Sequence, residues 1–177
     1  MVDSKDFASF IRSVPDFPKK GIVFRDITTL LNDPVAFKEV LDRFESRFRS
    51  DHVDKIVGIE ARGFIFGAAL ADRLHVGFVP ARKPGKLPAK TLKEEYELEY
   101  GHDGIEIHSD AISRGERILI HDDLLATGGT ASATCRLVER MGGTIVGCSF
   151  LIELSFLKGR NRLKGYDLFS IIQYDSE

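Results

Sequence analysis

The sequence predicts an α/β fold in which helices flank a mainly parallel, twisted sheet. Short apolar segments that suit buried strands alternate with longer segments whose apolar residues recur at helical spacing. This alternation is typical of a parallel sheet that is covered on both faces. The length of 177 residues fits one domain, residues 1–177, with a substantial buried core.

The N-terminal part predicts two helices separated by a loop. Residues 4–13 carry apolar side chains on one side and are expected to form a short amphipathic helix. Pro15 and Pro18 end that helix, because proline interrupts helical structure. Asp33 suits the N-cap, and Pro34 the first position, of a longer helix with one apolar face.

The rest of the chain predicts the sheet and its remaining helices. Strands are expected at residues 55–59, 77–81, 118–121, 144–154 and 168–172, and helices at 64–74, 131–141 and 156–163. Ile105 and Ile107 indicate one further extended segment. Ligands of such sheets bind beyond the carboxyl ends of the strands, so the loops that follow the strands are the candidate site.

Composition and charge narrow the class of protein. A net charge of −2 gives no reason to expect nucleic acid or an anionic membrane as the main partner. The first residues lack the layout of a signal peptide, and no apolar run is long enough for a membrane span, so we expect a cytoplasmic protein. Cys135 and Cys148 are too few for a disulfide framework or a metal site and are interpreted as reduced, buried thiols.

The most informative stretch is residues 118–130, ILIHDDLLATGGT. A strand-like start leads to two adjacent carboxylates, Asp122 and Asp123, and then to a small turn before a helix. Glycines let the backbone approach a ligand, and N–H groups at a helix start bind phosphate. The carboxylates can accept hydrogen bonds from ribose hydroxyls. The pattern therefore predicts a ribose 5-phosphate site; the alternative is a plain strand–loop–helix connection with solvated acids.

The same stretch resembles the signature of the type I phosphoribosyltransferases, which bind phosphoribosyl pyrophosphate (PRPP), and its DDLLATGGT form is similar to that of members acting on adenine. His121 departs from the pattern, since this position is usually apolar or acidic, and it is expected to be structural and to point away from the ligand. The residues that the resemblance implies for phosphoribosyl binding are Asp122, Asp123, Ala126, Thr127, Gly128, Gly129 and Thr130.

The resemblance also implies an activity. Such an enzyme transfers the 5-phosphoribosyl group from PRPP to adenine, giving AMP and pyrophosphate in purine salvage. Mg²⁺ is expected to bind mainly through PRPP, so no protein residue is assigned as a metal ligand. The family resemblance further implies a homodimer, with no nucleic acid and no membrane as partners.

Two further loops are expected to bind the leaving pyrophosphate. Arg62 follows a strand at a helix start, which suits an anion, and the alternative is an exposed loop arginine. A basic cluster follows the next strand, where a merely solvated surface is the alternative. By resemblance, the pyrophosphate contacts are Glu60, Ala61, Arg62, Arg82, Lys83 and Lys86, with a cis peptide bond between the first two.

The adenine pocket and a lid are implied by similarity alone. The segment GIVFRDI, residues 21–27, resembles the family's base-binding segment, and about residues 1–32 would form a hood. Phe24 would stack on the purine, and the alternative is a core aromatic. The adenine contacts implied are Val23, Phe24, Arg25 and Leu154, whereas Glu153 is interpreted as structural.

The lid is expected at about residues 82–104, as a flexible catalytic loop. Within it, Glu99 is implied to handle the proton of the base, and Tyr100 to belong to the lid. The alternative is an alternating strand with a polar face that has no function.

Two other functions stay open at this point. One is the same reaction on hypoxanthine, guanine, xanthine or orotate, against which the GIVFRDI and LEYG segments argue. The other is a regulator that keeps the fold to sense PRPP and binds nucleic acid. Such a regulator should carry an added binding module or a basic face, and this sequence leads us to expect neither.

Overall fold

A computed structural model of the chain describes residues 7–97 and 102–176. Its central sheet consists of β3 (Lys55–Ile59), β4 (Gly77–Ala81), β7 (Arg117–Leu125), β8 (Thr144–Leu154) and β9 (Leu168–Tyr174). The strand order is β4-β3-β7-β8-β9, and every neighbouring pair is parallel. The predicted α/β fold with a mainly parallel sheet is confirmed, and the bounds predicted for β3, β4 and β8 agree with the structure.

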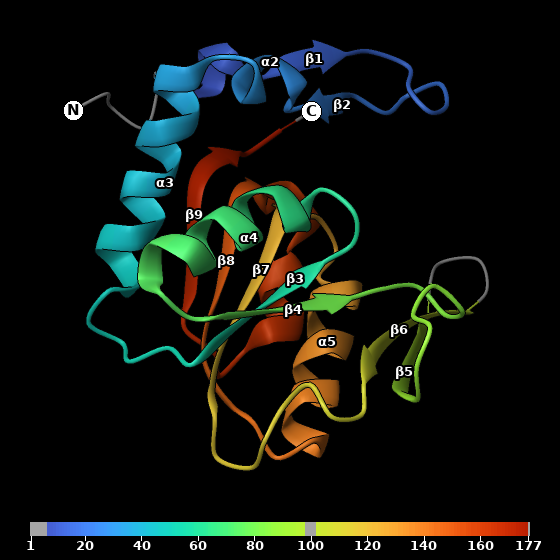
Figure 1. Ribbon diagram of the computed structural model, residues 1–177. Helices are drawn as coiled ribbons and strands as arrows, with labels where there is room; N and C mark the ends of the chain where they lie inside the picture. The colour runs from blue at the N-terminus through green and yellow to red at the C-terminus, as the bar shows by residue number, and fades with distance from the viewer. Residues whose placement is uncertain (1–6, 98–101, 177) are drawn as a thin grey trace.

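Helices cover both faces of this sheet (Figure 1). On one face, α3 (Pro34–Phe48) and α4 (Gly63–Leu74) pack against strand residues such as Ile56. On the other face, α5 (Gly129–Arg140) packs against the neighbouring residue Val57. Successive side chains of a strand point to opposite faces, so each apolar strand contributes to two hydrophobic cores.

The start of α3 follows the predicted capping pattern. The carboxylate of Asp33 accepts hydrogen bonds from the backbone N–H groups of Val35 and Ala36, both at 2.9 Å. Pro34 occupies the first turn, where its missing N–H group is not needed. The predicted apolar face of this helix is buried, and Phe44 is fully inaccessible to solvent.

The remaining elements are short. Two antiparallel hairpins stand apart from the sheet, β1 (Arg12–Val14) with β2 (Phe24–Asp26) and β5 (Thr91–Glu97) with β6 (His102–His108). The helical turns are α2 (Thr28–Leu31), η1 (Ala8–Phe10), η2 (Ser155–Leu157) and η3 (Gly159–Leu163). The end of β9 lies beside the β1–β2 hairpin, where Arg25 of β2 packs over the Tyr174 ring (Figure 1).

Three predicted elements need correction. The helix expected at residues 4–13 is wrong at its end, because Arg12–Val14 forms a strand that pairs with β2. The strand expected at 118–121 continues to Leu125, since β8 pairs with it that far, so the acidic pair lies inside the strand. The helix expected at 156–163 forms as two separate 3-10 turns.

Candidate active site

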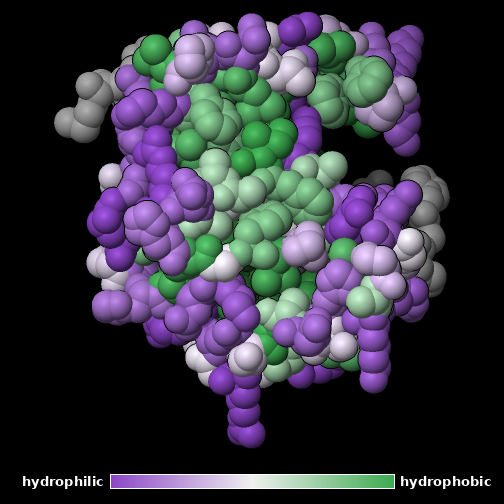
Figure 2. Space-filling model, viewed as in Figure 1, coloured by the Kyte–Doolittle hydropathy of each residue, from purple (hydrophilic) through white to green (hydrophobic). Residues whose placement is uncertain are grey.

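Three loops that follow parallel strands meet at one edge of the sheet. Residues 60–62 follow β3, residues 82–86 follow β4, and residues 126–130 follow β7. Arg82 Nε lies 2.8 Å from Glu60 Oε2, which joins the first two loops. Arg62 Nε lies 2.8 Å from Asp123 Oδ2, which joins the first loop to β7. Figure 2 shows the surface hollowed on this side, between the β1–β2 and β5–β6 hairpins.

Residues 126–130, here called the phosphate loop, enclose a small pocket. Its volume is about 80 Å³, and Asp122, Leu124 and Ala131 complete its lining. Gly128 adopts a left-handed conformation with φ 78° immediately before α5. The first N–H groups of a helix have no partner within the helix, so this turn offers donors to an anion.

The back of the phosphate loop is in contact with the turn between η2 and η3. A Cβ atom on Gly128 would lie 2.5 Å from the carbonyl oxygen of Gly159. A Cβ atom on Gly159 would lie 2.2 Å from the carbonyl oxygen of Ala126. The two backbones therefore approach so closely that neither glycine can be replaced without movement.

The two carboxylates of β7 lie in an environment that disfavours their charge. Burial raises the pKa of Asp122 well above its ordinary value, and the neighbouring charge of Asp123 raises it further. Burial also raises the pKa of Asp123, while the guanidinium of Arg62 opposes that rise. Asp122 accepts a hydrogen bond from the N–H group of Asp123 at 2.8 Å. Hydroxyl donors from a ligand would supply the stabilisation that water cannot give here.

Arg62, Arg82 and Lys83, three of the four predicted pyrophosphate-binding cations, are each paired with a carboxylate. Besides the pairs of Arg62 and Arg82, Lys83 Nζ lies 3.1 Å from Asp103 Oδ2 of β6. This contact raises the pKa of Lys83. The Lys86 side chain is exposed, and its backbone carbonyl accepts a hydrogen bond from Arg82 at 3.0 Å.

The peptide bond between Glu60 and Ala61 is cis, as the resemblance implied. Glu60 faces the second loop, because its carboxylate also accepts a hydrogen bond from the Lys83 N–H group at 3.1 Å. The loops after β3 and β4 are thus held as one unit.

Of the residues expected around the base, Phe24 and Arg25 lie on the β1–β2 hairpin and Val23 directly precedes β2, whereas Leu154 lies at the end of β8. The guanidinium of Arg62 lies 4.9 Å from the ring centroid of Phe24, so a residue expected to bind pyrophosphate contacts one expected to bind the base. Arg25 is buried, and its guanidinium lies 3.9 Å from the Tyr174 ring. Val23 is half-buried, and Leu154 ends β8 opposite Tyr174.

Two expected lid residues, Glu99 and Tyr100, lie outside the described residues. The adjoining β5–β6 hairpin reveals a contact that the sequence did not indicate. The Tyr96 hydroxyl lies 3.0 Å from Thr130 Oγ1 in the phosphate loop and 3.3 Å from Asp103 Oδ2. This chain of contacts joins Lys83 to Thr130. Tyr96 and Asp103 flank the LEYG segment, but nothing in their spacing distinguishes them from other hairpin residues.

His121 is a structural residue, as expected. It is fully buried against Phe44, and burial lowers its pKa to about 3. The Ser149 hydroxyl donates to the Ile120 carbonyl at 3.2 Å, so the hydroxyl oxygen is free to accept from His121 Nδ1 at 2.8 Å. The imidazole therefore stays neutral.

Residues 7–97 and 102–176 were also considered for a metal site, a membrane span and a second hollow in the surface. Within those ranges, no three His, Cys, Asp or Glu side chains are grouped so that they could hold a metal ion. No helix in the same ranges is both long and apolar enough to cross a membrane. A hollow of about 450 Å³ beside β9 is lined by Ala8, Arg43 and residues 169–173, none of which was predicted as a site residue.

Comparison with known proteins identifies the class. Residues 26–176 match the family described as phosphoribosyl transferase domain, so the chain is a phosphoribosyltransferase. The adenine phosphoribosyltransferase of Christiangramia forsetii is 56% identical over 169 residues, which cover 96% of this chain and 99% of the relative. The chain therefore belongs to the adenine phosphoribosyltransferases.

Solved structures agree with this assignment. The adenine phosphoribosyltransferase of Thermoanaerobacter pseudethanolicus is 54% identical with a TM-score of 0.94, covering 97% of this chain and 99% of the other. That of Saccharomyces cerevisiae was solved with adenine and an imino-altritol bisphosphate; it is 41% identical with a TM-score of 0.90, over 96% of this chain and 98% of the other.

Proposed function

We propose that this enzyme transfers the 5-phosphoribosyl group from PRPP to adenine, giving AMP and pyrophosphate in purine salvage. The observation that carries the proposal is the meeting of the phosphate loop, the two carboxylates of β7 and the paired cations at one edge of the sheet. These groups match the parts of PRPP in order: a phosphate, a diol and a pyrophosphate.

The roles follow from where the groups lie. The phosphate loop binds the 5-phosphate through N–H groups and the hydroxyls of Thr127 and Thr130. Asp122 and Asp123 accept hydrogen bonds from the ribose hydroxyls. Arg62 then leaves Asp123 for the pyrophosphate, and the other pyrophosphate contacts are Glu60, Ala61, Arg82, Lys83 and Lys86. The adenine pocket is formed by Val23, Phe24, Arg25 and Leu154.

The chemical step is a displacement at C1′ of the ribose. The bond between C1′ and the pyrophosphate oxygen breaks, its electron pair leaves with pyrophosphate, and N9 of adenine forms the new bond. The proton of N9 passes to a base, for which we propose Glu99, with Tyr100 in the same lid. Positive charge develops at the ribose, as at other glycosidic centres, so positioning and charge stabilisation supply most of the catalysis.

We infer that Mg²⁺ takes part without protein ligands. The carboxylates nearest the phosphate loop fit this inference, because Asp122 and Asp123 are assigned to the ribose hydroxyls. Held by oxygens of the substrate, Mg²⁺ would supply charge neutralisation for the pyrophosphate.

We propose a homodimer in which the outer face of α4 is covered. That face exposes Ile65 (39%) and Ala68. Figure 2 shows an apolar area over α4 on this side of the molecule. Apolar areas of this kind mark interaction surfaces. An Ile65→Lys variant should run as a monomer in light scattering, and a dimer of unchanged mass would contradict the assignment.

A cytoplasmic location is part of the proposal. The thiols of Cys135 and Cys148 are both free and buried, with their sulfur atoms 3.6 Å apart. Free thiols at this distance suit a reducing compartment. We also propose that residues 1–32 act as the hood and residues 82–104 as the catalytic loop within the single domain.

The test is nucleotide formation from PRPP and Mg²⁺ with adenine, hypoxanthine, guanine, xanthine or orotate supplied singly. We expect AMP from adenine and no product from the other bases. Product from a different base would show that the pocket around Phe24 is misassigned. Binding of PRPP without reaction on any base would favour the alternative function, a regulator that senses PRPP.

A further inference from the structure

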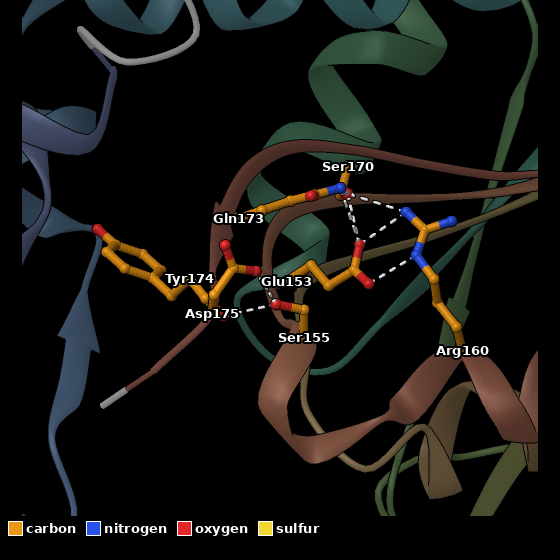
Figure 3. Close-up of polar contacts among 7 residues, drawn as sticks. All are labelled: Glu153, Ser155, Arg160, Ser170, Gln173, Tyr174 and Asp175. Carbon is orange, nitrogen blue, oxygen red and sulfur yellow. Dashed lines mark hydrogen bonds and ion pairs between the residues drawn. The ribbon is translucent and has the colours of Figure 1, made fainter.

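The end of β8 carries a buried carboxylate that the proposed reaction does not use. Glu153 is 3% exposed and accepts two parallel hydrogen bonds from Arg160, from Nε at 2.6 Å and from Nη2 at 2.7 Å (Figure 3). Ser170 of β9 donates a third at 2.6 Å. Burial raises the pKa of Glu153, but these hydrogen bonds outweigh burial and leave the pKa below its ordinary value. The pair is therefore ionised at neutral pH.

Arg160 follows directly after the glycine that contacts the phosphate loop. Gly159 begins η3, and the preceding residue, Lys158, turns the chain in a left-handed conformation with φ 56°. The Arg160 fork fixes the direction in which the chain leaves this turn, because two parallel hydrogen bonds allow one orientation of the guanidinium plane. Gly159 is thereby held against Ala126 and Gly128.

The other end of the turn is fixed as well. The Ser155 hydroxyl lies 2.9 Å from the carbonyl oxygen of Tyr174 and also contacts the Asp175 carboxylate, so the start of η2 is tied to the end of β9 (Figure 3). The Lys158 N–H group donates to the Ser155 carbonyl at 3.0 Å. The segment 155–160 is thus a short brace between the sheet and the phosphate loop.

The Glu153 carboxylate is buried, whereas the Arg160 side chain stays 43% exposed. Such a pair is a weak source of stability, because the cost of removing the carboxylate from water offsets the attraction, and water screens the guanidinium. The Glu153–Arg160 pair contributes more by fixing the orientation of the guanidinium than by adding stability. We propose that Glu153 and Arg160 are positioning residues for the phosphate loop. Their ion pair holds Gly159 against the loop, which keeps the loop in the shape that binds the 5-phosphate of PRPP and of AMP. This inference rests on the proposed function, since it assumes that the loop binds that phosphate.

The test compares two ligands that differ only in the 5-phosphate, AMP and adenosine, by titration calorimetry. Arg160→Lys keeps the charge but loses the fork, and Glu153→Gln keeps the shape but loses the charge. We expect both variants to bind AMP about tenfold more weakly or worse, ~1.4 kcal/mol, with adenosine binding within about twofold of wild type. The KM for PRPP should rise in step, while the KM for adenine stays constant.

The matched control is Arg73→Lys. Arg73 pairs with Asp42 and Glu45 between α3 and α4, away from the phosphate loop. It should change neither ligand's affinity. If Glu153→Gln does not fold, Ser170→Ala removes one hydrogen bond from the same carboxylate and should weaken AMP binding in the same direction.

The outcomes separate the two proposals. Unchanged AMP binding in the variants, or an equal loss for AMP and adenosine, would overturn the positioning role. Equal affinity of the wild-type enzyme for AMP and adenosine would instead overturn the assignment of the phosphate loop.

Discussion

Arg62 Nε lies 2.8 Å from Asp123 Oδ2, so a residue proposed to bind pyrophosphate is paired with a residue proposed to bind the ribose. The same guanidinium lies over the ring of Phe24, the proposed base-stacking residue. The Arg62 side chain therefore contacts both the proposed ribose site and the proposed base site. A change at Arg62 should be felt in substrate binding, because its side chain is one-third exposed and contacts both residues.

Arg62→Gln should lower kcat/KM for PRPP by about 30- to 1000-fold, ~2–4 kcal/mol, because a charge-assisted contact to pyrophosphate is lost. Inhibition by added pyrophosphate should weaken in parallel. Initial rates over a range of PRPP concentrations give the first quantity. Arg73→Gln, which removes a guanidinium paired between two helices, serves as the control. A kcat/KM equal to that of the wild type would remove Arg62 from the pyrophosphate site.

Gly128→Ala should lower the free energy of unfolding by about 1–3 kcal/mol, because φ 78° is strained for alanine and the new Cβ meets Gly159 at 2.5 Å. It should also raise the KM for PRPP. Gly115→Ala has a comparable φ of 87° with nothing within 4 Å of its Cβ. That control should show the strain in urea unfolding without the rise in KM. Equal KM values in both variants would contradict the tight fit of the phosphate loop.

Asp122→Asn should stabilise the protein at neutral pH while reducing activity. Burial and the charge of Asp123 raise the pKa of Asp122, so the folded state holds a proton that the unfolded state has released. Stability therefore falls as the pH rises from the ordinary carboxyl pKa of 3.8 toward the raised value, and the variant lacks this loss. Urea unfolding at pH 7 and at pH 4 measures the difference. A variant less stable than wild type at pH 7 would show that the Asp122 charge is well solvated.

His121 should give the opposite pH dependence. Burial lowers its pKa from 6.5 to about 3, so between these values the unfolded state binds a proton that the folded state does not. The free energy of unfolding should fall as the pH drops below 6.5, by about 1.4 kcal/mol per pH unit from this site. His121→Gln should lack that component. Identical slopes for variant and wild type would mean that the folded state accepts the proton.

Asp122 and His121 are neighbours in β7 whose contributions partly cancel. As the pH falls, protonation of Asp122 favours the folded state while His121 disfavours it. The acid sensitivity of Asp122→Asn should therefore exceed that of the wild type.

The central fold was predictable because its signals are local. The apolar run of β3 and the capping pair Asp33 and Pro34 mark their elements within a few residues. The strand at Arg12–Val14 was not predictable, because it depends on pairing with β2, twelve residues further along the chain. Helical spacing of apolar residues could not reveal that partner.

The candidate site was predictable in its loops but not in its contacts. Asp122, Gly128 and Arg62 stand at positions that strand ends and a signature indicate. Three contacts depend on tertiary packing: Lys83 with Asp103, Tyr96 with Thr130, and Glu153 with Arg160. Glu153 was interpreted as structural, and its partner Arg160 lies in a segment expected to be one helix but formed as two 3-10 turns.

The three cation–carboxylate pairs also bear on competition from the small anions of a cell. A free phosphate or sulfate ion that reaches Arg62, Arg82 or Lys83 must displace a tethered carboxylate, whose effective concentration is on the order of millimolar. PRPP joins a phosphate, a diol and a pyrophosphate in one molecule. Its pyrophosphate can therefore pair with the cations while its ribose hydroxyls donate hydrogen bonds to Asp123, which Arg62 has left. Under the proposed assignment, the vacant enzyme is thus shielded from inorganic salts that are abundant around it.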